Sequence, residues 1–204
     1  ADEQLEFLRN HPEIDHYVLL EGETAFSDLV GMIIENGSEC LVSQAGYLSG
    51  ILTLDPEGCQ LITGPENPRL KDLDVIPSPY LTGLFDKFFD GTMTPTIETI
   101  RGCPFQCTYC VQGDMYFSSI AKFSLERTRD ELYYIAEKMS TTPISTLQIV
   151  DSNFGSYKKD VEVARVIRET QDKFGWPTLV GSATGKAHID RVIETSNIMH
   201  NSLE

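Results

Sequence analysis

The sequence predicts an α/β fold in which parallel strands alternate with helices. Three strand–helix pairs follow one another after residue 94, and one earlier pair begins at residue 14. Successive pairs of this kind imply parallel strands joined by right-handed crossovers. A complete (β/α)8 barrel takes about 250 residues. We therefore expect a truncated, partial barrel that is preceded by part of another α/β domain.

Caps and stop signals set the elements of the later half. Ser124 is suited to cap a helix, and Gly175 with Pro177 stops a later one. The predicted strands are 96–100, 147–150 and 178–180, the helices are 124–139, 159–174 and 189–199, and the loops after the second and third strands are 151–155 and 181–187.

The first half is expected to combine one strand–helix pair with a β-hairpin. Residues 14–20 are interpreted as a buried strand, and apolar residues then recur at helical spacing over 24–36. Thr24 is a fair N-cap, and Gly37 stands where a C-cap belongs. Further on, two apolar runs flank a type I turn at 55–58, which predicts a hairpin over 47–62.

Proline positions and charge divide the chain. Four prolines interrupt residues 65–80, so this stretch is expected to be irregular, with a short amphipathic helix at 84–89. Residues 1–100 carry 18 acids and 4 bases, whereas residues 101–204 carry 13 and 12. We expect a first domain over 1–64, a linker over 65–93 and a second domain over 94–204.

The overall composition excludes several classes of protein. The net charge of −15 disfavours a nucleic-acid partner. Neither a signal peptide nor an apolar run of membrane length appears, so a cytoplasmic protein without a membrane partner is expected. The chain begins at Ala1 and closes on Leu-Glu, which we interpret as a piece of a longer protein. Its third strand would then be an open edge.

Three of the five cysteines lie in one short segment. Cys103, Cys107 and Cys110 have the spacing C-x-x-x-C-x-x-C within residues 101–110, here called the cysteine loop. Three thiolates with one vacancy suit a cubane iron–sulfur cluster with an open iron. A zinc site completed by a distant residue is the alternative. The residues available for it are His11, His16, His188, His200, Cys40 and Cys59; as an alternative role, the last two are expected to be small core residues.

Polar residues follow the later strands in the same way. Asp151 and Asn153 come after the second strand, and Ser182 and Thr184 come after the third. The carboxyl ends of parallel strands build the sites of such folds. These residues are therefore expected at the same end as the cysteine loop, although turn and capping roles are the plain alternative.

The cysteine loop, Arg-Gly-Cys-Pro-Phe-Gln-Cys-Thr-Tyr-Cys, resembles the cluster loop of radical S-adenosylmethionine enzymes. The family pattern is C-x-x-x-C-x-aromatic-C after the first strand of a partial TIM barrel, and Tyr109 fills the aromatic position. The order of elements extends the resemblance over residues 95–200.

The resemblance implies a [4Fe-4S] cluster held by Cys103, Cys107 and Cys110. Its fourth iron would chelate S-adenosylmethionine, and one electron would cleave a carbon–sulfur bond to give a 5′-deoxyadenosyl radical. The implied cofactor-binding residues are Tyr109, Asp151, Asn153 and Ser182; no catalytic residue is assigned. The implied partners are a small-molecule substrate of unknown identity and an electron donor such as a flavodoxin or ferredoxin.

The first half resembles the end of the Rossmann-like cobalamin-binding domain that precedes the radical domain in one subgroup. Residues 12–15, 21–26 and 73–80 carry this resemblance. The D-x-H-x-x-G segment that supplies a cobalt ligand does not occur in this chain, so cobalamin would be held through an upstream segment. The turn at 151–154 is closer to the D-x-N-F-like turn of this subgroup than to the Gly-Gly-Glu turn of many members.

Two other functions are compatible with the cysteine loop. A tRNA methylthiotransferase shares it, but the first domain of such enzymes brings three more cysteines, and a net charge of −15 suits tRNA poorly. A zinc-binding structural or interaction module is the alternative that is not an enzyme. We expect a radical enzyme as the full-length parent, with this piece incomplete by itself.

Overall fold

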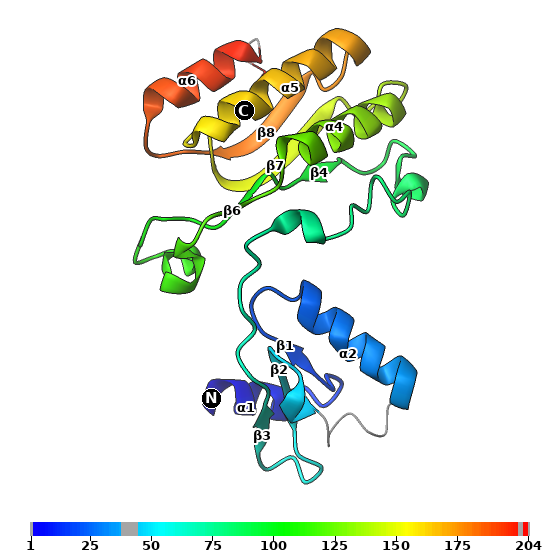
Figure 1. The fold of residues 1–204 in the computed structure, drawn as a ribbon, viewed down its shortest axis with the longest axis vertical. Helices are drawn as coiled ribbons and strands as arrows, with labels where there is room; N and C mark the ends of the chain where they lie inside the picture. Colours follow the sequence, from blue (N-terminus) through cyan, green and yellow to red (C-terminus); the bar gives the residue numbers. More distant parts are fainter. Residues whose placement is uncertain (1, 38–44, 200–201, 204) are drawn as a thin grey trace. The chain divides into compact units, whose positions relative to one another are not determined.

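The computed structural model describes residues 2–37, 45–199 and 202–203, and Figure 1 shows the path of the chain. The chain divides into two compact units, residues 1–70 and residues 71–204. Cys40 and His200, named above as candidate ligands, lie outside the described residues. Within the described part, none of the helices has the length and apolar character needed to cross a membrane.

The first unit is a small antiparallel sheet with two helices. The strand order is β1-β2-β3, and Tyr17 of β1 pairs with Leu52 of β2. Helix α2 covers this sheet through Ala25 and Leu29, which pack on Ile51. The elements are α1 (Asp2–Asn10), β1 (Tyr17–Val18), α2 (Glu23–Asn36), the 3-10 turn η2 (Ala45–Tyr47), β2 (Ile51–Leu54) and β3 (Leu61–Thr63).

The hairpin prediction is confirmed, because β2 and β3 pair antiparallel around a turn in which Gly58 N–H donates to the Asp55 carbonyl at 2.9 Å. Two other expectations are wrong. The described strands of the first unit form no parallel, Rossmann-like pair, because the neighbour of β1 is the antiparallel hairpin strand β2. The N-cap of α2 is Gly22 and not Thr24, whose hydroxyl bonds Asn67 instead.

Glu21 fastens residues 67–70 to the first unit. Its carboxylate accepts from Arg69 Nε at 2.8 Å and from Leu70 N–H at 3.0 Å. Asn67 Nδ2 donates to the Glu21 carbonyl at 2.8 Å. The charged turn that precedes α2 is therefore held by contacts with residues 67–70. The start of the proline-rich stretch packs with the first unit for this reason.

The second unit is built on a parallel sheet of order β4-β7-β8. Thr96 pairs with Gln148, and Leu147 pairs with Val180. The predicted order of strands and helices is confirmed, with helices α4, α5 and α6 on one side of the sheet (Figure 1). The regular elements are β4 (Thr96–Ile97), β5 (Ile100–Arg101), β6 (Ala121–Lys122), α4 (Leu125–Met139), β7 (Thr146–Phe154), α5 (Lys158–Phe174), β8 (Leu179–Thr184) and α6 (Ile189–Ile198), and the 3-10 turns are η3 (Leu73–Val75), η4 (Asp86–Phe88), η5 (Val111–Gly113) and η6 (Met115–Ser118).

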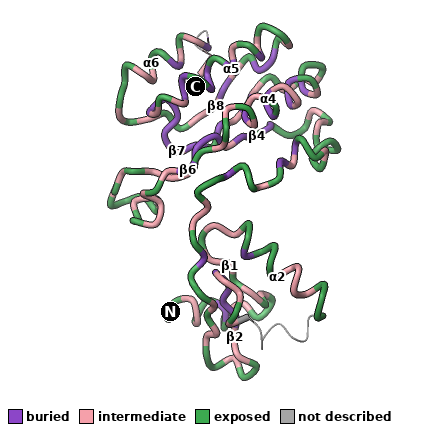
Figure 2. The backbone as a smooth tube through the Cα atoms, in the orientation of Figure 1, coloured by how far each residue is buried: buried purple, intermediate pink, exposed green. Residues whose placement is uncertain are grey.

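One face of the parallel sheet makes the core of this unit. Leu147 and Ile149 of β7 are fully buried and belong to one apolar cluster with residues of α4 and α5. The buried positions in Figure 2 gather along these helices and strands. Val150, which follows Ile149 along the strand, is 54% exposed. Since side chains alternate along a strand, the opposite face of β7 is partly exposed among the described residues.

Several predicted boundaries differ from the structure. The stretch 96–100 is not one strand: β4 ends at Ile97, and Ile100 belongs to a separate antiparallel pair. Both later strands run further than predicted, because β7 continues to Phe154 and β8 to Thr184. The polar residues 151–153 stay within β7 although their composition is typical of turns. The pairing with β8 resumes at Phe154, opposite Thr184, after an irregularity in the register. Helix α1 was not predicted, and the helix expected at 84–89 is only η4.

The edge of β8 has a neighbour at one point. Val180 forms an isolated parallel bridge with Leu203, and its N–H donates to the Ser202 carbonyl at 2.7 Å. The expectation of a fully open edge is therefore too simple, because the segment after α6 returns to pair beside this strand.

We expect the change Ser124→Ala to lower the free energy of unfolding of the second unit by about 1 kcal/mol. The Ser124 hydroxyl accepts from Arg127 N–H at 3.0 Å at the start of α4. Urea unfolding followed by fluorescence of the only tryptophan, Trp176, would measure the change in this unit. Ser124→Asp, which retains a capping oxygen, should lose much less. Equal losses in both variants would contradict a capping role.

Candidate functional site

The cysteine loop begins in a short antiparallel ribbon. β5 leads into the loop and β6 returns from it, with Arg101 opposite Ala121. The three cysteines and the turns η5 and η6 lie between these strands, in the segment that extends from one end of the sheet in Figure 1. A local pairing therefore closes the loop, and the sequence prediction of one continuous strand missed it.

Two glycines allow the backbone to fold back tightly here. Gly102 has φ +109°, and a Cβ at this position would lie 2.5 Å from the Ser119 carbonyl oxygen. A Cβ at Gly113 would lie 2.3 Å from the carbonyl oxygen of Cys107. A side chain at either position would push the returning segment away from the cysteines, so both glycines fix the compactness of the loop.

The three cysteines are free thiols on this loop. Cys103 and Cys107 are half-buried and Cys110 is exposed. Backbone bonds order them, since Cys103 N–H donates to the Phe117 carbonyl at 2.8 Å and Cys110 N–H to that of Cys107 at 3.1 Å. Across the described residues, no three His, Cys, Asp or Glu side chains already surround one point. The donor set itself fits a cubane, because it is three soft thiols free of disulfides, and their role as ligands stays a prediction.

Asn153 reaches this loop from β7. Its Nδ2 donates to Cys103 Sγ at 3.1 Å. The side chain is only 4% exposed, and it lies in the same buried row of β7 as Ile149. The structure therefore brings together two of the predicted site residues, which are 50 positions apart in the sequence.

Asp151 lies in the same row and ties β7 to the connection between β4 and β5. One carboxylate oxygen accepts from Thr99 N–H at 2.7 Å and the other from the Thr99 hydroxyl at 2.5 Å. Burial raises the pKa of Asp151 to about 6, and the Thr99 hydrogen bonds oppose this shift only in part. These contacts hold the strand that leads into the cysteine loop. Thr99 was not identified from the sequence.

We expect Asp151→Asn to be more stable than the parent above pH 6, by about 2–3 kcal/mol. The folded-state pKa of Asp151 is raised, so the native state keeps a proton that the unfolded state has lost. Stability from this group is therefore present at pH 4 and is lost as the pH rises to about 6. An asparagine keeps the shape and cannot ionise.

Urea unfolding at pH values from 4 to 8, followed by Trp176 fluorescence, would test this. The advantage of Asp151→Asn should shrink as the pH falls toward 4. The exposed Asp130 on α4 offers the control Asp130→Asn, which should leave the profile unchanged. A constant difference between Asp151→Asn and the parent at every pH would contradict the buried carboxyl.

Tyr109 is the most exposed of the predicted cofactor residues, at 81%. Lys186, which follows β8, places its Nζ 5.7 Å from the centre of the Tyr109 ring. Hydrogen bonding to Tyr109, and then the charges of Tyr109, Cys107 and Cys110, raise the pKa of Lys186. A lysine cation therefore lies beside the cysteine loop. In the sequence, the only sign of this role is that Lys186 closely follows a predicted strand.

The predicted residues of the third strand are not gathered with the cysteines by any described contact. Ser182 pairs with Ile149 in the sheet, and its hydroxyl is buried with no hydrogen-bond partner among the described atoms. Thr184 is exposed at the end of β8. Ser152, by contrast, bonds the side chain of Gln112 in η5 at 2.5 Å. The site role of Ser182 stays a prediction.

One more group near Cys103 was missed from the sequence. The Tyr157 hydroxyl is buried and has no hydrogen-bond partner among the described atoms. Burial raises the pKa of Tyr157 to about 12, and the nearby charges of Cys103, Asp160 and Asp151 add to this effect. Tyr157 therefore stays neutral beside a loop that is rich in thiols.

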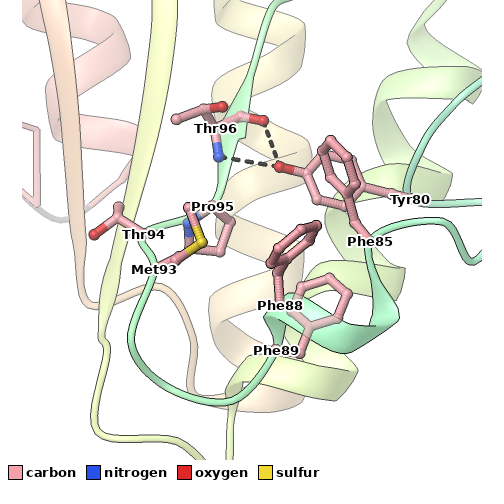
Figure 3. Close-up of a pocket in the computed structure, with 8 residues that line it drawn as sticks. All are labelled: Tyr80, Phe85, Phe88, Phe89, Met93, Thr94, Pro95 and Thr96. Carbon is pink, nitrogen blue, oxygen red and sulfur yellow. Dashed lines mark hydrogen bonds between the residues drawn. The ribbon is translucent and has the colours of Figure 1, made fainter.

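A separate cavity of about 320 Å³ lies at the other end of β4. Tyr80 closes one side of it, because its hydroxyl donates to the Thr96 carbonyl at 2.7 Å and accepts from Thr96 N–H at 3.1 Å (Figure 3). This cavity precedes the strand, whereas the cysteine loop comes after it. Half of its lining residues are aromatic: the lining is Tyr80, Phe85, Phe88, Phe89, Met93, Thr94, Pro95 and Thr96.

Comparison with known sequences identifies relatives along almost the whole chain, although no family model matches it. The chain is 30% identical over 202 residues to the cobalamin-dependent radical SAM methyltransferase TokK of Streptomyces tokunonensis, covering 96% of this chain and 28% of that protein. It is 30% identical over 203 residues to the 2-(S-pantetheinyl)-carbapenam-3-carboxylate methyltransferase of Streptantibioticus cattleyicolor, covering 97% and 28%.

Solved structures share the fold. The enzyme OxsB, solved with aqua-cobalamin and S-adenosylmethionine bound, has a TM-score of 0.62 at 21% identity over 99% of this chain and 28% of that chain. TsrM from Kitasatospora setae, solved with cobalamin and a [4Fe-4S] cluster bound, has a TM-score of 0.65 at 16% identity, covering 94% and 38%. What is shared is a mixed α/β fold with a small parallel sheet; the described residues contain no closed barrel.

The chain is therefore homologous to cobalamin-dependent radical S-adenosylmethionine methyltransferases. It spans 28% of the length of these two relatives.

Proposed function

We propose that this chain is the part of a radical S-adenosylmethionine methyltransferase that holds the [4Fe-4S] cluster and forms one part of the S-adenosylmethionine site. The observation that carries the proposal is the placement of Cys103, Cys107 and Cys110 on one glycine-shaped loop at the end of a parallel sheet. The homology to cobalamin-dependent methyltransferases supports it.

The three thiolates would hold three irons, which leaves one iron for the amino and carboxylate groups of S-adenosylmethionine. When bound, the cluster supplies the single electron that starts radical chemistry on this cofactor. Tyr109 and Phe105 flank the thiols in the sequence, and their rings would limit the access of water to them. The Lys186 cation beside Tyr109 would favour anionic groups on this side of the loop.

The activity of the parent is proposed to be methyl transfer to a small organic substrate, with cobalamin held by segments outside residues 1–204. The cobalt-ligating motif is absent from this sequence, and the described strands of the first unit are antiparallel. A ferredoxin or flavodoxin in the cytoplasm would supply electrons. Later strands of a partial TIM barrel would pack beyond β8 and complete the substrate site.

The test is anaerobic reconstitution with iron and sulfide. We expect about four iron and four sulfide per chain, and a change in the EPR spectrum of the reduced cluster when S-adenosylmethionine is added. Stoichiometric zinc without iron would instead favour a structural zinc module. A cluster whose spectrum does not respond to S-adenosylmethionine would contradict an open iron.

A further inference from the structure

We propose that Asn153 is a positioning residue for Cys103: its amide hydrogen-bonds the Cys103 sulfur, holds this ligand in place and raises the reduction potential of the cluster. This inference rests on the proposed function. It gives Asn153 a role toward the cluster ligand, besides the cofactor binding that the resemblance implies for this residue.

In the hydrogen bond between Asn153 and Cys103, the amide is the donor and the sulfur is the acceptor. Asn153 Nδ2 lies 3.1 Å from Cys103 Sγ, inside the distance of an N–H···S hydrogen bond. A thiolate only accepts hydrogen bonds, so the NH2 group and not the amide oxygen must face it. No other side-chain hydrogen bond to the sulfur of Cys103 is found among the described residues.

The fold holds this amide rigidly. Asn153 is 4% exposed, and β7 pairs with β4 on one side and β8 on the other. The pairing with β8 is irregular between Ile149 and Phe154, and such irregularities re-aim side chains near sites. Two residues earlier, Asp151 clamps Thr99 with two hydrogen bonds. The same strand therefore fixes both the amide and the segment that leads to Cys103.

The expected consequence follows from charge. Reduction adds an electron to the cluster, and the negative charge on its sulfurs increases. A hydrogen bond donated to a ligating sulfur stabilises that added charge, so it raises the potential. The burial of Asn153 strengthens the effect, because little water competes for its amide N–H group. A cluster without the amide should be harder to reduce.

The first arm of the test uses the reconstituted protein. Asn153→Ala should still assemble about four irons per chain, but its one-electron reduction equilibrium should become about tenfold less favourable, which equals about 59 mV toward lower potential. EPR-monitored redox titration measures this. The matched control is Asn67→Ala, which removes a buried asparagine of the first unit and should leave the potential unchanged.

The second arm needs no cluster and covers the case in which Asn153→Ala folds poorly. Asn153→Asp keeps the side-chain shape but places a carboxylate against the sulfur, which disfavours the reactive thiolate. At pH 8, alkylation of Cys103 by iodoacetamide, followed by mass spectrometry, should slow about tenfold relative to the parent. Alkylation of the exposed Cys110 should stay the same.

These outcomes separate the two proposals. If the parent protein assembles no cluster, the proposed function fails, and the alkylation arm alone decides the role of Asn153. If the cluster forms in Asn153→Ala with the parental potential, or Cys103 is alkylated at the parental rate in Asn153→Asp, the positioning role is wrong.

Discussion

Cys107→Ala is expected to abolish assembly of a full cubane. A cubane needs a protein ligand for each of three irons when S-adenosylmethionine takes the fourth, and this variant would offer only two thiolates from the loop. Iron and sulfide analysis after anaerobic reconstitution, together with the EPR signal of the reduced protein, measures the loss.

The chain offers a matched control for this change. Cys59 is also a free and exposed thiol, but it lies in the hairpin turn of the first unit. Cys59→Ala should load the same iron as the parent. A full cubane in Cys107→Ala would refute the ligand assignment, whereas equal losses in both variants would indicate iron bound without a specific site.

Ile149→Ala is expected to destabilise the second unit by about 2–5 kcal/mol, because it empties part of a close-packed core. Ile149 is completely buried in the central strand, within one apolar cluster with α4 and α5. Trp176 is the only tryptophan of the chain and is 3% exposed in that cluster, so urea unfolding followed by its fluorescence reports this unit alone.

The neighbouring residue supplies the control. Val150 is 54% exposed on the other face of β7, and Val150→Ala should cost under about 1 kcal/mol. Similar losses for the two variants would mean that both faces of the sheet are packed, contrary to the alternation seen in this strand.

The order of strands and helices in the second unit was predictable because apolar periodicity and caps are local signals. Ser124 caps α4, and Gly175 ends α5 in the left-handed conformation, as expected. The ends of β7 and β8 were not predictable, since polar residues such as Asp151 have the composition of a turn, and only the pairing of Phe154 with Thr184 shows that the strands continue past them. The sheet of the first unit was misjudged for a related reason: a strand followed by a helix does not reveal whether its neighbour is parallel.

The candidate site divides in the same way. The cysteine spacing is contiguous and could be recognised directly. Contacts made through folding could not, because Thr99, Lys186 and Tyr157 reach this region only once the strands are assembled. The resemblance indicated that Asn153 belongs to the site, but its contact with a sulfur needed coordinates.

The short ribbon of β5 and β6 has a practical consequence for anyone who wishes to copy this loop. A synthetic peptide of residues 99–123 would carry all three thiols and both strands of the ribbon, yet neither the Asn153 amide nor the Lys186 cation. Such a peptide would reproduce the ligand set while leaving out the surroundings that tune it. Transplanting the loop into another scaffold would therefore require a host strand that places a side-chain amide within hydrogen-bond distance of the sulfur that corresponds to Cys103.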